Sequence, residues 1–426
     1  MTSAIASGKR PRGRDIYEQH RVSTPLELLF DLTFVVAIAL AASQLHHGVM
    51  EHHLGAASLS FLMAFFGIWW AWMNYTWFAS AYDDDSWSFR LLTMVQMVGV
   101  LIFAAGVPGL MSGDFRAGVL GYAVMRLALV VQWLLAARGH PQCRATCQRY
   151  AMGIALVQLC WIARLWLPPE WQLASFALLA LFEMLVPLWA ERAGTTPWHA
   201  HHIAERYGLL VIITLGECVL GATNAVAGVW QTAGWSVTLA VVGLGSTMLV
   251  FALWWMYFLL PSGEALHHHR ERSFVWGYGH FFLFASVAAM GAGLEVVADV
   301  LKHGMTAAAT SGVATTAASV GALPAVAPDT KAAHGVSALY AITLLACIQA
   351  AFMLLLWLIH AYATRARDHQ GWLALASIAC VGIAPLAVWL GVAPHWALPL
   401  LCVGPALAIA YNEHGRRRRS DSFAVR

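Results

Sequence analysis

Residues 25–36 read PLELLFDLTFVV, and this stretch decides the fold class because it carries two acidic side chains into an apolar run long enough to cross a bilayer. An ionisable side chain at membrane depth costs roughly 2.5 kcal/mol or more, so it is usually retained for a function. Residues 202–217, HIAERYGLLVIITLGE, begin a second apolar run in the same way. Two such helix starts, one in each half of the chain, predict a site built between two related halves.

The composition places the chain in the membrane. It is 60% hydrophobic and only 11% charged, whereas about 25% of the residues of a typical soluble domain are charged. Apolar windows of about 20 residues predict twelve spans, at about 26–45, 54–80, 91–112, 117–137, 149–167, 171–190, 203–225, 234–260, 274–298, 335–361, 371–391 and 395–412. The expected fold class is therefore an all-α polytopic membrane bundle of about twelve transmembrane helices.

The positions of the basic residues predict the orientation. Most of the 25 Lys and Arg residues fall in segments on the side of the N-terminus, and only Arg116, Lys302 and Lys331 fall in the opposite segments. Because positive loops stay inside, both termini are expected to be cytoplasmic. The net charge of +3 then reflects orientation and indicates no nucleic-acid partner. The basic run 416–419 is expected to face anionic lipid in the bilayer.

The chain reads as an internal duplication. The aromatic run 69–75, WWAWMNY, has a counterpart in 254–257, WWMY, and each run precedes a polar turn and a further apolar helix. Six spans per half would make the repeats parallel, related by an axis along the membrane normal. The predicted organisation is a cytoplasmic tail at 1–23, a first six-span repeat at 24–192, a second at 199–414 with an external Ala/Thr-rich loop at 302–334, and a basic cytoplasmic tail at 415–426.

Both helix starts also carry a family resemblance. Residues 24–35, TPLELLFDLTFV, resemble the opening signature of the bacterial low-temperature-requirement A family, and residues 202–217 resemble its central signature. The resemblance covers most of residues 22–412. It implies a multi-pass protein of the bacterial cytoplasmic (inner) membrane, and it implies no particular substrate, because the family is named for a requirement in cold growth. The first helix is also similar to the Phe-Ser-Asp helix of the endolysosomal potassium channels, although Phe30 and Asp31 lack the intervening Ser.

Five charged residues of these two helices are candidates for an ion-binding or transport site. Glu27 and Asp31 are four residues apart and so share one helix face. Glu205 and Arg206 are adjacent and point in different directions, which favours bonds to the first half, such as one between Arg206 and Asp31. Glu217 lies 12 residues beyond Glu205, about 18 Å deeper at 1.5 Å per residue. The alternative is that these groups reach interfacial water or form a structural salt bridge between the repeats.

Arg126 is the sixth candidate, in the middle of the fourth predicted span. Unpaired it would be very unfavourable, so it needs a carboxylate, and Glu217 or Glu183 lies at a suitable depth. Such a pair is either structural or a switchable pair in a transport path. The three His clusters (46–53, 199–202 and 267–269) lack the ligand spacing of a dedicated zinc site, so no metal and no cofactor is expected.

The function expected from these residues is transport. HExxH, GxSxG and Walker A sequences are missing, and the cytoplasmic loops are short, so we expect no enzyme. We expect a secondary transporter or permease for an ion or small solute, with a cation channel and a non-transporting membrane scaffold or sensor as alternatives. The predicted spans contain five deep or semi-deep acids but only three arginines, so arginine cannot pair with every acid. This excess of acids favours transport over a scaffold. The acids are Glu27, Asp31, Glu183, Glu205 and Glu217, and the arginines are Arg126, Arg164 and Arg206.

Overall fold

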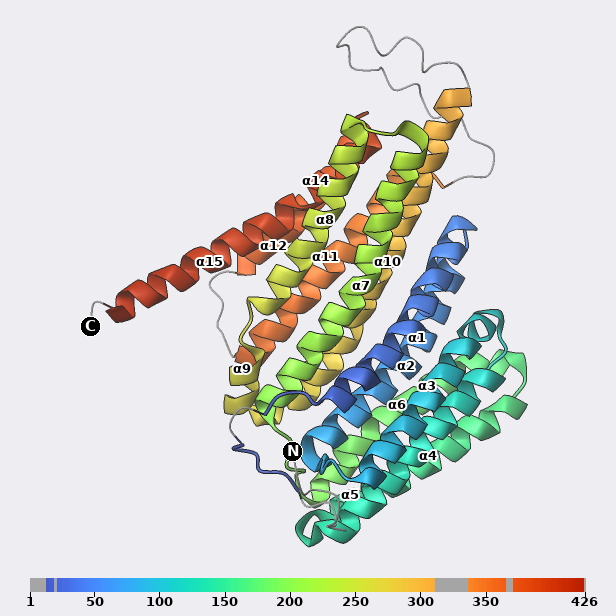
Figure 1. Cartoon of the computed structure of the whole chain (residues 1–426), viewed down its shortest axis with the longest axis vertical. Coiled ribbons are helices and arrows are strands. Elements are labelled where there is room, and N and C mark those ends of the chain that lie inside the picture. Colours follow the sequence, from blue (N-terminus) through green and yellow to red (C-terminus); the bar gives the residue numbers. More distant parts are fainter. Residues whose placement is uncertain (1–12, 19–20, 311–335, 365–370, 425–426) are drawn as a thin grey trace. The chain divides into compact units, whose positions relative to one another are not determined.

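The chain folds into helices. The computed structural model describes residues 13–18, 21–310, 336–364 and 371–424, with the side chains of 307–310 and 415–424 left out. Within these ranges there is no strand, which confirms the all-α fold class (Figure 1). The helices are α1 (Pro25–Met50), α2 (Leu54–Tyr82), α3 (Trp87–Ser112), α4 (Arg116–Gly139), α5 (Arg144–Ala163), α6 (Gln172–Ala190), α7 (Ala200–Ala233), α8 (Val237–Phe258), α9 (Ser262–His268), α10 (Ser273–Thr310), α11 (Ala338–Thr364), α12 (Gly371–Cys380), α13 (Ile383–Trp389), α14 (Ala397–Leu401) and α15 (Val403–Ala424).

Eleven helical segments of the described chain are long and apolar enough to cross a membrane, against the twelve predicted. The difference is the predicted fifth span, where α5 forms a helix of 20 residues but does not reach that apolar character. Its sequence carries Arg144, Gln148, Arg149 and Gln158, and it packs between α4 and α6. The length and number of the apolar helices fit a polytopic membrane protein.

The chain divides into two compact units. Unit 1 comprises residues 1–44 and 57–209, and unit 2 comprises residues 45–56 and 210–426. The division does not coincide with the predicted halves 24–192 and 199–414, because the first turns of α7 pack with unit 1 and the last turns of α1 pack with unit 2. The duplication itself stays a prediction.

Unit 1 is held together by closely packed neighbouring helices. α3 packs on α4, α4 on α5 and α5 on α6, and these helices lie side by side in Figure 1. Glycine allows the closest approach: a Cβ added to Gly121 of α4 would lie 2.3 Å from the backbone nitrogen of Phe103 and 2.6 Å from the carbonyl oxygen of Gly99, both in α3. Small residues at such contacts are typical of membrane helix pairs.

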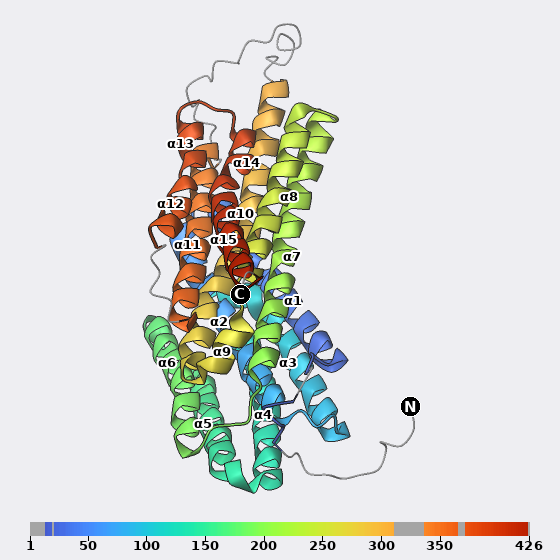
Figure 2. The ribbon, with the colours of Figure 1, turned by 90° about the vertical axis from the view of Figure 1, so that its left-hand side faces the viewer.

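In unit 2, α10 packs on α11 and α8 packs on α14, as Figure 2 shows for the helices labelled there. α10 continues to Thr310, so the first residues of the predicted loop 302–334 are helical. Residues 311–334 of that loop lie outside the described residues. The predicted basic tail 415–426 begins as a continuation of α15, which runs to Ala424.

Candidate functional site

Five of the six predicted site residues lie in unit 1, and Glu217 lies in unit 2. Inside unit 1 they do not form one group. Four of them lie where α1 and α7 begin, and Arg126 of α4 belongs to a separate ion pair.

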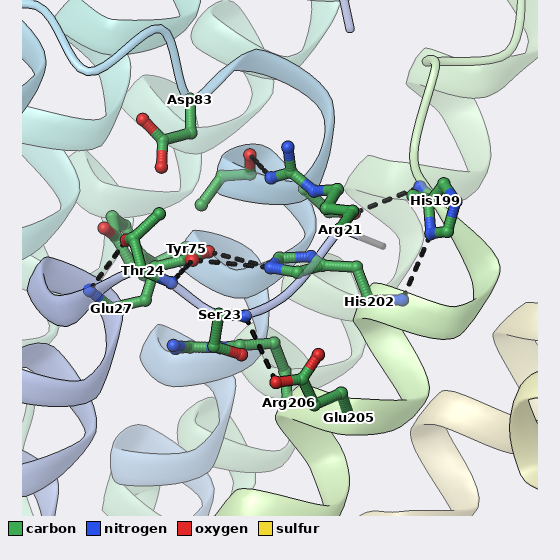
Figure 3. Close-up of polar contacts among 12 residues, drawn as sticks. Arg21, Ser23, Thr24, Glu27, Tyr75, Asp83, His199, His202, Glu205 and Arg206 are labelled. Carbon is green, nitrogen blue, oxygen red and sulfur yellow. Dashed lines mark hydrogen bonds and ion pairs between the residues drawn. The ribbon is translucent and has the colours of Figure 1, made fainter. Parts of the chain in front are cut away.

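The start of α1 is fixed by a reciprocal capping arrangement. The backbone N–H of Thr24 donates to Glu27 Oε2 at 2.8 Å, and the N–H of Glu27 donates to Thr24 Oγ1 at 3.3 Å (Figure 3). This is the capping box expected of a Thr followed three residues later by a Glu, with Pro25 at the first helical position. The side chain of Glu27 is thereby held at the beginning of the helix and is fully buried.

Glu27 also contacts α7. His202 Nε2 lies 3.2 Å from Glu27 Oε1 and 3.3 Å from Oε2, and both side chains are inaccessible to solvent. The backbone N–H of His202 also donates to Nδ1 of the His199 side chain at 3.2 Å. A buried carboxylate therefore meets a buried imidazole between two helix starts that are far apart in the sequence.

One turn further along both helices, Asp31 of α1 pairs with Arg206 of α7. Arg206 NH2 donates to Asp31 Oδ1 at 2.5 Å, so the salt bridge expected from the sequence is present. Trp72 Nε1 of α2 donates to the same oxygen at 2.7 Å. All three side chains are buried, and the bonds join α1, α2 and α7. We refer to Glu27, Asp31, His202 and Arg206 as the α1–α7 cluster.

The α1–α7 cluster keeps unused polar atoms. Asp31 Oδ2, His202 Nδ1 and both Nε and NH1 of Arg206 are buried and have no hydrogen-bond partner among the residues that the structure describes. Glu27 Oε1 also lacks a hydrogen bond there, and its contact is the ion pair with His202. A buried donor or acceptor left without a bond costs about 1–3 kcal/mol. The cluster therefore offers both acceptors and donors to an ion, a proton or a small polar solute.

Further polar groups surround the cluster at its end of unit 1. The backbone N–H of Ser23 donates to Glu205 Oε1 at 3.1 Å, so the predicted site residue Glu205 holds the chain leading into α1 and is only half-buried. Arg21 is buried and donates to the carbonyl oxygen of Ala79 at 3.0 Å.

Asp83 is the third carboxylate in this part of unit 1 that is almost inaccessible, at 4% exposure, after Glu27 and Asp31. Burial, together with the negative charge of Glu27, raises the pKa of Asp83 to about 6, although Arg21 and Arg14 act in the opposite direction. Burial has the opposite effect on basic groups, and it lowers the pKa of Arg21 and of His199. Several ionisable groups therefore share one poorly solvated region (Figure 3).

Arg126 forms the second buried ion pair of unit 1, with Glu183 of α6. Glu183 was one of its two predicted partners. Glu183 Oε2 also accepts from Trp70 Nε1 at 2.8 Å, and Oε1 accepts from Tyr122 Oη at 3.1 Å and Trp161 Nε1 at 3.2 Å. Each carboxylate oxygen thus has two donors, and four helices meet at this group. Such a carboxylate is fixed in place and suits a structural role.

Glu217 lies on α7 inside unit 2 and is half-buried. It faces α10, because a Cβ added to Gly291 would lie 2.7 Å from Glu217 Cβ. Glu295 is one turn further along α10 and accepts from Asn224 Nδ2 at 2.9 Å. No ion pair involves Glu217 within the described part of the chain. It is therefore a carboxylate in an apolar setting with a second carboxylate nearby.

Three features of the site were not predicted from the sequence: the contact of His202 with Glu27, the hydrogen bond from Trp72 to Asp31, and the additional donors around Glu183. His202 carried a usable signal, because it precedes Arg206 by four residues as Glu27 precedes Asp31. The tryptophans carried none, since tryptophan is also common as packing and at interfaces. Across the described residues no group of three or more His, Cys, Asp or Glu side chains is placed to hold a metal ion.

Comparison with known proteins gives two findings. The family model described as "Bacterial low temperature requirement A protein" matches residues 22–410. An uncharacterized protein of Rhizobium meliloti (strain 1021) is 26% identical over 279 residues, which cover 62% of this chain and 66% of that relative. The aligned part thus spans slightly less than two thirds of the relative.

Proposed function

This chain belongs to the bacterial low temperature requirement A family, whose model covers residues 22–410, and we propose that it is a secondary transporter or permease for an ion or small solute. It is an integral membrane protein with many apolar helices. The observation that carries the proposal is the α1–α7 cluster, in which fully buried charged groups keep donors and acceptors available.

The two buried carboxylate sites of unit 1 differ in the way that transport requires. A group that binds and releases a proton or an ion must be able to exchange partners. Both oxygens of Glu183 are doubly hydrogen-bonded, whereas Glu27 and Asp31 each keep one oxygen without a hydrogen bond among the described residues. Buried ionisable groups in membrane helices typically mark ion pathways and proton relays. This contrast supports a working role for Glu27 and Asp31 with Arg206 and His202.

Glu217 is the second proposed working group. It lies on the same helix as His202, Glu205 and Arg206, it is half-buried, and it has no ion pair in the described chain. We assign it the binding of the transported or coupling cation in unit 2, and we assign Arg126 the role of countercharge to Glu183. The proposal treats the chain as a carrier rather than an enzyme.

The proposal is tested by flux into vesicles. Purified full-length protein is reconstituted into liposomes, and the pH-dependent uptake of candidate ions and solutes is measured against protein-free liposomes. Glu27→Gln, Asp31→Asn and Glu217→Gln should each reduce flux at least tenfold, because each removes a charge at a buried binding group. Glu170→Gln is the matched control, since Glu170 is exposed in the loop before α6.

Three outcomes would contradict the proposal. Unchanged flux in all three variants would remove the carboxylates from transport. Unitary currents in planar bilayers would favour a cation channel. No solute or ion movement by folded protein would favour a membrane scaffold or sensor.

We further propose that the protein lies in the cytoplasmic membrane with both termini in the cytoplasm, because Lys and Arg are concentrated in the segments that would then face inward. A reporter enzyme active only in the periplasm should be silent when fused after residue 426 and active when inserted between residues 113 and 114, in the turn between α3 and α4. The reverse result would invert the topology.

A further inference from the structure

The buried groups around the α1–α7 cluster carry more negative charge than the buried arginines can balance. Among the described residues at this end of unit 1, three carboxylates and two arginines are almost inaccessible to solvent: Glu27, Asp31 and Asp83, and Arg21 and Arg206. Arg14 is partly exposed and bonds Glu18, so that pair is balanced by itself. An uncompensated charge in a poorly solvated region is unfavourable, so this region favours the uptake of one cation.

The contacts within the cluster do not suit a metal cation. The carboxylate of Glu27 contacts a backbone N–H and an imidazole nitrogen, and that of Asp31 contacts an indole N–H and a guanidinium. The metal cations that carboxylates prefer are held by several oxygen ligands, and the guanidinium of Arg206 would repel such an ion beside Asp31. A proton needs only one acceptor atom.

Glu27 and His202 are the two members of the cluster that can share this proton. Arg206 keeps its proton at every physiological pH, whereas an imidazole gains and loses one between about pH 5 and pH 8. Glu27 Oε2 accepts from the backbone N–H of Thr24, while Oε1 lies 3.2 Å from His202 Nε2 and has no hydrogen bond among the described residues. A proton on Nε2 therefore meets a carboxylate oxygen that is able to accept it.

Charged and titratable groups from the neighbouring segments act on this pair. They come from α1, α2, α7 and the segments that join these helices, and they are Asp31, Tyr75, Arg206, Arg21, Asp83 and His199. The acids among them attract a proton and the arginines repel it. Because both signs are present, the surroundings do not lock the pair in one state.

We propose that the α1–α7 cluster binds and releases a proton, and that Glu27 and His202 share it. Within the pair, the N–H bond at Nε2 breaks as an O–H bond forms at Oε1, which converts imidazolium and carboxylate into neutral imidazole and carboxyl. Loss of the proton to water then leaves imidazole and carboxylate. The half-buried Ser23 and Thr24 lie beside Glu27 on the way to solvent (Figure 3).

This inference rests on the proposed transport function and names the proton as the ion that the cluster exchanges. The test is nuclear magnetic resonance of purified full-length protein in lipid nanodiscs, with isotope-labelled histidine. It requires no transported solute. The signal of His202 is the one that His202→Gln removes.

The His202 signal of the wild type should titrate between about pH 5 and pH 8. In Glu27→Gln it should remain that of a neutral imidazole down to about pH 5, because an imidazolium would then be buried without its carboxylate. Replacing N-methylglucamine chloride by sodium or potassium chloride at equal ionic strength should leave the wild-type midpoint unchanged.

Glu191→Gln is the matched control. Glu191 also accepts from a backbone N–H, that of Thr196 at 3.0 Å, but it follows α6 and lies outside the α1–α7 cluster. Its variant should titrate like the wild type. If Glu27→Gln does not fold, Glu27→Asp takes its place, since it keeps the charge but draws it back from the ring and should shift the His202 midpoint.

Three results would overturn the proposal: a His202 signal that does not titrate in folded wild type, the same titration in Glu27→Gln as in the wild type, or a midpoint that moves with sodium or potassium. The last result would assign the cluster to a metal cation. Any of them together with lost flux in Glu27→Gln would remove the proton and keep the transport function. A titrating pair with full flux in Glu27→Gln would instead support the proton site and contradict the transport function.

Discussion

At the scale of single residues, the buried acids of unit 1 differ in how fully their oxygens are bonded. Glu183 has four donors around it, including Arg126 and two indole N–H groups. Asp31 has two donors on one oxygen and none on the other within the described chain. The first arrangement is suited to holding helices together, and the second is suited to exchanging a partner.

Glu183→Gln should therefore lower stability strongly. The substitution leaves Arg126 buried without a counter-charge, and breaking a buried pair on one side typically costs about 3–5 kcal/mol. The thermal unfolding midpoint of the purified protein in detergent should fall markedly. The double variant Glu183→Leu with Arg126→Met should recover much of the loss, because it removes both charges; an unchanged midpoint for Glu183→Gln would show that the pair contributes little.

The pH dependence of stability should carry a contribution from Asp83. Burial raises its pKa in the folded protein from the ordinary 3.8 to about 6, so the folded state binds this proton more tightly than the unfolded chain does. Its stabilising contribution is then fully present below about pH 4 and is lost as the pH rises through about 6. At about 1.4 kcal/mol per pKa unit the loss is about 3 kcal/mol.

Asp83→Asn should remove this step. Compared with the variant, the wild type should lose stability between pH 4 and pH 7, as measured by thermal unfolding midpoints across that range. Asp84→Asn, at the neighbouring and more accessible position, is the control and should follow the wild type. Parallel curves for wild type and Asp83→Asn would contradict the burial argument.

At the scale of elements, the pairing of α3 with α4 depends on glycine. A Cβ on Gly121 would collide with backbone atoms of Phe103 and Gly99, which cannot move as a flexible side chain can. Gly55 of α2, in contrast, has nothing within 4 Å of its added Cβ. The two glycines thus separate the packing effect of a methyl group from its general effect on a helix.

Gly121→Ala should destabilise the protein by about 1–3 kcal/mol, the usual effect of overpacking a close contact. Gly55→Ala should be neutral or slightly stabilising, because alanine favours helix over glycine by up to about 1 kcal/mol. Unfolding midpoints of the two variants in the same detergent provide the comparison. Equal midpoints would mean that α3 and α4 can separate without loss.

The pairing of α1 with α7 shows what the sequence could and could not predict at this scale. Glu27 and Asp31 repeat at four residues, and so do His202 and Arg206, so matched faces could be predicted, as the Asp31–Arg206 salt bridge was. For Arg126, the expected depth in the membrane left two possible carboxylate partners, Glu183 and Glu217, and Glu183 is the one that pairs with it. The additional donors from Trp70, Trp72 and Trp161 depend on how helices rotate against one another, which periodicity does not determine.

At the scale of the whole molecule, composition and apolar windows predict the membrane class and nearly all the helices, because bilayer thickness fixes the length of a span. The predicted span at 149–167 corresponds to α5, which is not apolar enough to count among the candidate membrane spans. The division into compact units was not predicted, because it runs through the last turns of α1 and the first turns of α7 rather than through loops. Chain segments that look like one span by hydropathy can therefore contribute to two packing units.

Flux and stability, measured in the same protein preparations, decide whether the α1–α7 cluster carries transport. We predict that Glu27→Gln abolishes uptake into liposomes while its unfolding midpoint stays close to that of the wild type. For Glu183→Gln we predict the opposite, a lowered midpoint with wild-type flux for each molecule that remains folded. Full flux in Glu27→Gln, or loss of flux per folded molecule in Glu183→Gln alone, would contradict the assignment of transport to the α1–α7 cluster.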